Sequence, residues 1–390
     1  MAAIHPGSGE RLEATDSDRS EPGASVNARL DPAAAAPVDR PRGTITVTVI
    51  GATGYAGGEA VRLLAQHPNV RIVGLVGRGR EHEPVATAHP HLASTGLEID
   101  QEPVQAEAVF LALPHGAAAG MVPGLIDQGS TIIDLGPDFR LRNKADYPRW
   151  YNLEHPAPEL LERAVYGLPE LHRKELMALA DGSVRIVGAP GCYPTATLLA
   201  LAPLARAGLI DDLVVDAKSG VSGAGREAKP DMLFSEVNES VKAYGVGGHR
   251  HVAEIEQELA GLSPVEWANP GVGAVDFVPH LIPMTRGILS SCHVRPTRPV
   301  SQPQLDEMYA HAYAGEPFVQ VVTTPPATKH VLGSNVCRVF IRHDARTNRI
   351  LAIGVIDNLV KGAAGQAVQA FNLVHGLPET AGLDQLPLNP

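Results

Sequence analysis

One cysteine of this sequence occupies a position where a thiol would be reactive. Cys192 lies in the run Gly188-Ala-Pro-Gly-Cys-Tyr-Pro-Thr195, between an apolar, strand-like stretch and a helix-like stretch. At a strand-to-helix turn a thiol feels the positive end of the helix dipole, which favours the nucleophilic thiolate. Cys292 and Cys337 lie inside strand-like runs and are expected to be small core residues. The sequence therefore predicts Cys192 as a nucleophile, with a buried structural thiol as the alternative.

Two histidines before a helix-like stretch are candidates for an acid or a base. His249 and His251 lie in the run Gly247-Gly-His-Arg-His-Val-Ala-Glu254, so Glu254 follows His251 by about one helical turn. A carboxylate on that side of the helix would orient the imidazole and raise its basicity. A metal site is the competing interpretation, but no third ligand stands at a recognisable spacing, and we predict no metal. Two surface histidines without a chemical role are a further alternative.

A glycine-rich turn near the start of the folded chain predicts a dinucleotide site. Two residues separate Gly51 from Gly54 and Gly54 from Gly57. These glycines come directly after the β-branched run 44–50 and before the helix-like run 59–66. Small residues at such a turn let a pyrophosphate approach the N–H groups of the helix N-terminus. An ordinary tight turn is the alternative.

The end of the next apolar run, at residues 70–76, bears on the choice of cofactor. An NAD site would place a carboxylate there for the ribose hydroxyls, but the sequence has Arg78 and Arg80. An arginine suits a 2′-phosphate, so NADP(H) is the expected cofactor. A solvated basic turn is the alternative.

Three further runs combine glycine or asparagine with a cation. They are Ser219-Gly-Val-Ser-Gly-Ala-Gly-Arg226, Asp138-Phe-Arg140 and Asn358-Leu-Val-Lys-Gly362. Backbone donors and a guanidinium fork suit a phosphate or a carboxylate. Ordinary loops or helix caps are the alternative reading of each run.

The order of apolar runs predicts an α/β protein with two domains. Strand-like and helix-like stretches alternate from residue 44 to about 190, which is typical of a doubly wound parallel sheet. Longer strand-like runs follow, which favour a second α+β domain on a mixed or antiparallel sheet. We therefore expect a disordered tail at residues 1–43, a dinucleotide-binding domain at 44–191, a catalytic domain at 192–357, and a C-terminal helix within 358–390 that completes the first domain.

Composition excludes several kinds of partner. The chain has 32 Lys and Arg against 43 Asp and Glu, a net charge of −11, so we expect no nucleic acid partner. Its apolar runs are too short for a membrane span. Three cysteines fit neither a disulfide framework nor paired zinc ligands, and the acidic tail does not look like a signal for export, so the cytoplasm is the expected location.

From residue 44 onward the chain resembles the N-acetyl-gamma-glutamyl-phosphate reductases of arginine biosynthesis. The resemblance rests on nine motifs in order: Gly51-Ala-Thr-Gly-Tyr-Ala-Gly57, Ala112-Leu-Pro-His-Gly116, Asp134-Leu-Gly-Pro-Asp-Phe-Arg140, Tyr166-Gly-Leu-Pro-Glu170, Pro190-Gly-Cys-Tyr-Pro-Thr195, Ser222-Gly-Ala-Gly-Arg226, Gly248-His-Arg-His251, Pro283-Met-Thr-Arg-Gly287 and Asn358-Leu-Val-Lys-Gly362.

The resemblance implies a Rossmann-type NADP-binding domain, a dimerisation domain and a homotetramer that acts on a small acyl phosphate. It implies that Cys192 attacks the acyl phosphate and that His251 is the acid or base, with His249 beside it and Glu254 as its orienter. It assigns cofactor contacts to Gly51, Thr53, Gly54, Tyr55, Ala56, Gly57, Pro114, His115 and Asn358, and substrate contacts to Arg140, Ser222, Gly223 and Arg226, whereas the turn with Arg78 departs from the Ser/Thr-bearing turn of the family.

Three other functions remain open at this point. Aspartate-semialdehyde dehydrogenase is similar in fold and chemistry, but its nucleophile usually follows an asparagine, whereas Cys192 follows a glycine. An aminoadipyl phosphate reductase of lysine biosynthesis shares the Cys-Tyr-Pro pattern. A regulatory protein that binds NADP without catalysis would have no use for the nucleophile.

Overall fold

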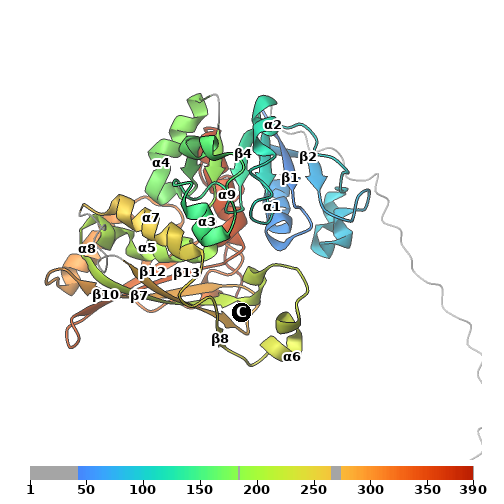
Figure 1. Cartoon of the computed structure of the whole chain (residues 1–390). Coiled ribbons are helices and arrows are strands. Elements are labelled where there is room, and N and C mark those ends of the chain that lie inside the picture. The colour runs from blue at the N-terminus through green and yellow to red at the C-terminus, as the bar shows by residue number, and fades with distance from the viewer. Residues whose placement is uncertain (1–42, 183–184, 265–273, 390) are drawn as a thin grey trace, which may run out of the picture. The chain divides into compact units, whose positions relative to one another are not determined.

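Two β-sheets organise the chain (Figure 1). The computed structural model describes residues 43–182, 185–264 and 274–389, so all of the expected tail except Gly43 lies outside the described residues. The first sheet has six strands and the second has seven. Both the doubly wound sheet and the second, mixed sheet predicted from the sequence are confirmed.

The first sheet is parallel throughout, and its strands lie in the order β2-β1-β3-β4-β6-β5. Its strands β3, β4 and β6 are entirely buried, which explains their continuous apolar runs. The chain reverses its direction of winding at β1, and ligands of such sheets bind outside the carboxyl ends of the strands at that point. The strands are β1 (Ile45–Ile50), β2 (Val70–Val76), β3 (Ala108–Leu111), β4 (Thr131–Asp134), β5 (Ala164–Tyr166) and β6 (Ile186–Gly188); the helices between them are α1 (Tyr55–Gln66), α2 (Val122–Asp127), α3 (Asp146–Tyr151) and α4 (Pro169–Ala178).

The second sheet is mixed, in the order β11-β12-β13-β10-β7-β9-β8. The pairs β7–β9 and β11–β12 are parallel and the other pairs are antiparallel. Helices α5, α7 and α8 lie on one face of it (Figure 1). Its strands are β7 (Ile210–Gly220), β8 (Lys242–Ala243), β9 (Val275–Ile282), β10 (Ile288–Pro296), β11 (Val319–Val322), β12 (Cys337–Asp344) and β13 (Arg349–Ile356); its helices are α5 (Cys192–Arg206), α6 (Phe234–Val237), α7 (His251–Leu262) and α8 (Gln302–Ala312).

Helix α5 packs very closely on this sheet. A Cβ added at Gly354 of β13 would lie 2.1 Å from the carbonyl oxygen of Ala196 in α5. Cys292 and Cys337 are fully buried on the same side, as the sequence predicted for core thiols. The helix that begins at Cys192 is therefore held against a rigid sheet.

The C-terminal segment returns to the first sheet. After β13 the chain makes a π-helical turn at Val360–Ala364 and continues into α9 (Gly365–Val374). The ring of Phe371 in α9 lies 5.6 Å from that of Phe110 in β3, and α9 shares one apolar core with β1 and β3. The last helix is thus part of the core of the first sheet.

A buried ion pair fixes the π-helical turn. The Nζ of Lys361 donates to Glu170 at 2.6 Å and to Gln369 at 2.6 Å, and both charged side chains are completely buried. Burial alone would raise the pKa of Glu170, but the cation beside it holds that pKa below its usual range. The charge pair joins α4, the turn and α9.

Replacing Lys361→Met should lower the free energy of unfolding by about 3–5 kcal/mol, because Glu170 would stay buried without its cation. The double variant Lys361→Met/Glu170→Gln, which removes both charges, should recover much of this loss. Denaturant unfolding of the three proteins checks this. Equal stability of the single variant and the parent would contradict it.

Candidate functional site

Cys192 is the first residue of α5, four residues after β6 ends at Gly188. Gly191 caps the helix, and Thr195 donates its backbone N–H to the Gly191 carbonyl at 3.0 Å. The cysteine is free, and the residue as a whole is partly exposed. A Cβ added at Gly362 would lie 2.8 Å from the Cβ of Cys192, so the π-helical turn packs directly on this residue. The strand-to-helix location predicted for Cys192 is confirmed.

The resting thiol is not activated as the sequence indicated. Burial raises the pKa of Cys192 to about 11, although the charge of Arg140 and the N–H groups of the first helical turn act in the opposite direction. The expectation of a thiolate favoured by the helix N-terminus is therefore wrong for the ligand-free protein. A neighbouring base must take the proton before the sulfur can attack.

His251 is placed to be that base. It begins α7, and its ring lies over Gly191, where an added Cβ would come within 2.4 Å of the imidazole Nε2. Burial, with the charges of His249 and Arg140, lowers the pKa of His251 well below its usual value. The imidazole is therefore neutral at pH 7 and can accept a proton beside Cys192.

His249 packs against His251. The two rings are 4.7 Å apart, and Nδ1 of His249 accepts the backbone N–H of His251 at 3.2 Å. The His249 ring also packs edge-on against Tyr193 at 5.8 Å. Burial lowers its pKa to about 4, and the charge of Arg250 acts in the same direction. Of the two histidines, His251 is the one in contact with the backbone next to the cysteine.

Glu254 orders the loop before the cysteine. Its Oε2 accepts the backbone N–H of Gly191 and the hydroxyl of Tyr166, both at 3.0 Å, and its Oε1 accepts from Arg140 at 3.1 Å. The nearest approach to Nε2 of His251 is 4.0 Å, too long for a hydrogen bond. The expectation that Glu254 would raise the basicity of His251 is wrong, since the pKa of this histidine falls.

Arg140, which was expected to bind the substrate, is buried and donates hydrogen bonds to three protein acceptors. Its Nε donates to the Ala189 carbonyl at 2.7 Å, its Nη2 to the Leu135 carbonyl at 2.8 Å, and its Nη1 to Glu254. All three nitrogens thus bind protein acceptors. The guanidinium holds the carboxyl ends of β4 and β6 together and neutralises Glu254.

The glycine turn fits a dinucleotide. Gly51 has a φ of +89°, and a Cβ there would lie 2.2 Å from the carbonyl oxygen of Ala112. A Cβ at Gly57 would lie 2.1 Å from the carbonyl oxygen of Gly51, so packing within the protein demands both glycines. A Cβ at Gly54 would meet only ordinary contacts with the protein, and it would fill the space in front of the α1 N-terminus. No side chain caps that terminus, so its N–H groups can receive a pyrophosphate.

The other expected cofactor residues lie around this turn. Thr53 packs on Gly77, where an added Cβ would come within 2.4 Å of its methyl group, and Tyr55 is partly exposed at the start of α1. Arg78 is exposed, and no described residue forms a hydrogen bond or ion pair with its guanidinium, whereas Arg80 pairs with Glu83 at 2.9 Å. Ala56 lies in the first turn of α1. Arg78 is therefore the freer of the two candidate 2′-phosphate ligands.

The loop with Pro114 and His115 follows β3 and is fixed by Asp138. The carboxylate of Asp138 accepts the backbone N–H groups of Gly116, Ala118 and Ala119 at 2.7–3.1 Å. His115 faces the histidine pair, since its Nδ1 lies 3.3 Å from Nη1 of Arg250. The loop that follows β3 is therefore in contact with Arg250, the residue that precedes α7.

Ser222 and Asn358 bind each other. The Asn358 amide donates to the Ser222 hydroxyl at 2.9 Å and accepts the Gly287 N–H at 2.7 Å, and both side chains are buried. A Cβ at Gly223 would lie 2.8 Å from the Ser219 hydroxyl. These residues fasten the loop after β7 to the segment after β13, and they lie close to the glycine turn through Arg226, which donates to the Thr53 carbonyl at 3.0 Å.

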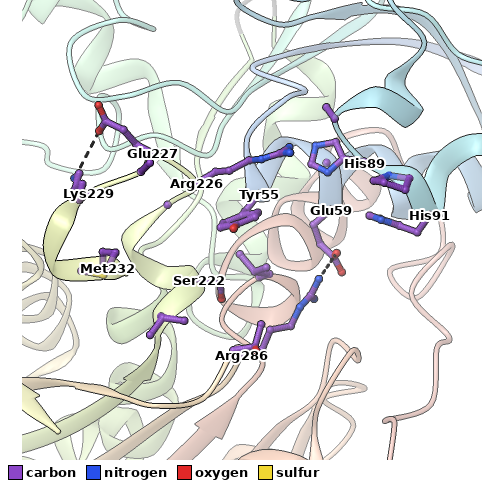
Figure 2. A pocket seen from close by; sticks show the side chains of 18 of the residues that line it. Tyr55, Glu59, His89, His91, Ser222, Arg226, Glu227, Lys229, Met232 and Arg286 are labelled. Atoms are coloured by element: carbon purple, nitrogen blue, oxygen red, sulfur yellow. Dashed lines mark hydrogen bonds and ion pairs between the residues drawn. The ribbon is translucent and has the colours of Figure 1, made fainter. Parts of the chain in front are cut away.

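A cavity of about 510 Å³ opens beside α1 (Figure 2). Tyr55, Ser222 and Arg226 line it, and the ion pair between Glu59 and Arg286 closes one side at 2.9 Å. Cys192 does not line this cavity. The cavity therefore belongs to the surroundings of the glycine turn, and the assignment of the reactive centre depends on the cysteine and histidine geometry instead.

Two residues near the cysteine and histidines, Tyr166 and Arg250, were not predicted from the sequence. Tyr166 lies in a quoted motif, but nothing in its local pattern shows that it reaches Glu254. Arg250 stands between the two histidines, and its position there was the available signal.

A metal site was the competing interpretation of the two histidines, and no membrane span was expected. Among the described residues, no group of three or more His, Cys, Asp and Glu side chains is placed to hold a metal ion. The helices in that same part of the chain are each too short or too polar to cross a membrane.

Two family models match the chain. The semialdehyde dehydrogenase NAD-binding domain matches residues 46–179, and the semialdehyde dehydrogenase dimerisation domain matches residues 192–358. The fold and the site thus define an oxidoreductase of the semialdehyde dehydrogenase class that binds a nicotinamide cofactor.

Curated relatives narrow this class. The N-acetyl-gamma-glutamyl-phosphate reductase of Heliobacterium modesticaldum is 46% identical over 359 residues, which cover 89% of this chain and 100% of the relative. That of Symbiobacterium thermophilum is 48% identical, over 87% of this chain and 97% of the relative. The chain belongs to the N-acetyl-gamma-glutamyl-phosphate reductase family.

Solved structures share the fold. Aspartate semialdehyde dehydrogenase with NADP from Candida albicans has a TM-score of 0.64 at 14% identity, over 87% of this chain and 99% of that one. Aspartate semialdehyde dehydrogenase II from Vibrio cholerae, complexed with ASA, has a TM-score of 0.62 at 18% identity, over 85% and 98%. At such identities the likeness concerns the fold alone.

Alkylation of Cys192 by iodoacetamide should accelerate by about tenfold per pH unit between pH 7 and 9 in the ligand-free protein, because the thiolate fraction keeps rising below a raised pKa. Mass spectrometry of the Cys192 peptide gives the rate. Cys192→Ser is the control for labelling elsewhere. A rate that levels off at about pH 9 would mean an unraised thiol pKa, and a plateau at lower pH would mean a lowered one; either result would contradict the prediction.

Proposed function

We propose that this protein reduces N-acetyl-5-glutamyl phosphate to N-acetylglutamate 5-semialdehyde and phosphate, with NADPH as the reductant, in arginine biosynthesis. Membership of the reductase family supports the substrate. The observation that carries the chemistry is the position of the His251 ring, which lies against Gly191 directly before Cys192. The lowered pKa of His251 and the raised pKa of Cys192 are consistent with a proton transfer from the thiol to the imidazole.

The first half of the reaction is acyl transfer to sulfur. His251 takes the proton of the Cys192 thiol while the sulfur attacks the carbonyl carbon of the acyl phosphate. The bond from that carbon to the phosphate oxygen then breaks, and phosphate leaves with the electron pair. The product is a thioester on Cys192, and the proton is held on His251.

The second half releases the aldehyde. When bound at the glycine turn, the reduced nicotinamide supplies the hydride that the acyl carbon needs to become an aldehyde carbon. The sulfur of Cys192 leaves with the electron pair of the carbon–sulfur bond and takes back the proton from His251. Glu254 and Arg140 touch no reacting atom in this scheme, and they act as positioning residues for the loop that carries Cys192.

We further propose that the cofactor is NADP(H), that the active form is a homotetramer, and that the protein works in the cytoplasm. The unpaired Arg78 at the end of β2 supports the first proposal. The dimerisation domain matched by residues 192–358 supports an oligomer, and the three free cysteines suit a reducing compartment.

In the reverse direction, with phosphate and NADP, kcat/KM should be at least about a hundredfold higher for N-acetylglutamate semialdehyde than for aspartate semialdehyde. The shorter substrate lacks a methylene group and brings a free ammonium where the acetamide should bind. Formation of NADPH is followed by absorbance, with Cys192→Ser as the inactive control. A preference for aspartate semialdehyde would refute the proposed substrate.

Arg78→Ala should weaken NADPH binding by about tenfold and leave NADH binding nearly unchanged, because only NADPH has a 2′-phosphate for the guanidinium. Arg80→Ala is the matched control, since Arg80 already pairs with Glu83. Titration of protein fluorescence measures both cofactors. Equal binding of NADPH and NADH by the parent would contradict an NADP site at this turn.

A further inference from the structure

The proposed substrate carries several negative charges, so its site needs a cation. The sequence placed Arg140 and Arg226 there, but Arg140 is buried and its three nitrogens bind protein acceptors. Arg226 is directed to the carbonyl of Thr53 in the glycine turn. Both guanidinium groups are thus already bound to protein acceptors in this structure.

Arg250 is an exposed cation at the histidine pair. It lies between His249 and His251, immediately before α7, and it forms no ion pair with any carboxylate of the described residues. Its Nη1 lies 3.3 Å from Nδ1 of His115. Its guanidinium carbon lies 5.9 Å from the centre of the Tyr151 ring. Two side chains of the first domain thus hold the unpaired charge in place.

The charge of Arg250 reaches the reacting groups. It lowers the pKa values of His249 and His251, so it is electrostatically close to both imidazoles. Tyr151, whose ring lies near this guanidinium, has a buried hydroxyl without a hydrogen-bond partner among the described residues. A buried polar group without a partner is uncommon and calls for an explanation. A polar ligand held by the neighbouring guanidinium of Arg250 supplies one.

We propose that Arg250, supported by His115 and Tyr151, binds an oxyanion group of the substrate beside the histidine pair. The group is the phosphoryl or the carboxylate of the acyl phosphate, since a guanidinium binds both in the same forked geometry. This subsite rests on the proposed function, because that function supplies the anionic substrate. Arg250 thereby takes the role that the sequence gave to Arg140.

A purely electrostatic role is the competing explanation. Without contact to the substrate, Arg250 would still keep the two histidines neutral through its charge. Removing it would then raise the pKa of His251 and move the acid limb of kcat, with no change in KM. A guanidinium that binds the substrate changes KM instead.

The test compares Arg250→Gln and Arg250→Lys with the parent in the reverse reaction, which uses inorganic phosphate and N-acetylglutamate semialdehyde as separate substrates. We expect Arg250→Gln to raise KM for one of them by about tenfold or more, and Arg250→Lys to raise it less. A rise for phosphate identifies the phosphoryl group, and a rise for the semialdehyde identifies the carboxylate. Arg298→Gln, which removes another exposed arginine, should change neither constant.

A second readout does not need turnover. In the parent, the ligand whose group binds Arg250, either inorganic phosphate or the semialdehyde, should protect Cys192 from iodoacetamide. Arg250→Gln should need about tenfold more of that ligand for the same protection. Unchanged KM values with unchanged protection would overturn the subsite, and so would a shifted acid limb of kcat alone. A parent that is inactive on N-acetylglutamate semialdehyde but active on another semialdehyde would refute the proposed function instead, and the same KM comparison on that other substrate would still test Arg250.

Discussion

The geometry of the reactive centre depends on one buried carboxylate. Glu254 is completely buried and accepts hydrogen bonds from Arg140, from Tyr166 and from the backbone of Gly191. These three groups and Glu254 itself, which lies in α7, come from four separate parts of the chain. Losing one partner would leave a buried charge unsatisfied, which is costly. The carboxylate therefore fixes the backbone immediately before Cys192 and the helix that carries His251 in one arrangement.

The same burial sets the chemical state of the centre at rest. A thiol with a raised pKa and an imidazole with a lowered pKa are both neutral at pH 7. The pair is thus not a thiolate–imidazolium pair, and the proton moves only when an electrophile arrives. A neutral thiol is a poor target for oxidants and alkylating agents, so the burial also protects the nucleophile between turnovers.

The sequence predicted the fold and the position of the nucleophile well, because these depend on local patterns. Each of these patterns spans only a few neighbouring residues: the apolar runs predict the strands, the glycine turn predicts the start of α1, and the Gly-Cys-Tyr-Pro sequence predicts the start of α5. The partners of Glu254 could not be predicted in this way, since they are 63, 88 and 114 residues away along the chain. The pKa of Cys192 differs from the expectation for a related reason: the helix dipole is visible in the local sequence, whereas the burial that outweighs it involves distant segments such as the turn around Gly362, which packs on this residue.

The position of that turn also governs when the centre can exist during synthesis. Gly362 packs on Cys192, and α9, only a few residues later, belongs to the core built around β1 and β3. Domains generally fold as units as the chain leaves the ribosome, the N-terminal ones first. Here the N-terminal sheet lacks part of its core until almost the whole chain has been made. The nascent protein therefore lacks the turn that packs on Cys192 until late in synthesis, and the reactive centre is assembled in one of the last steps of folding.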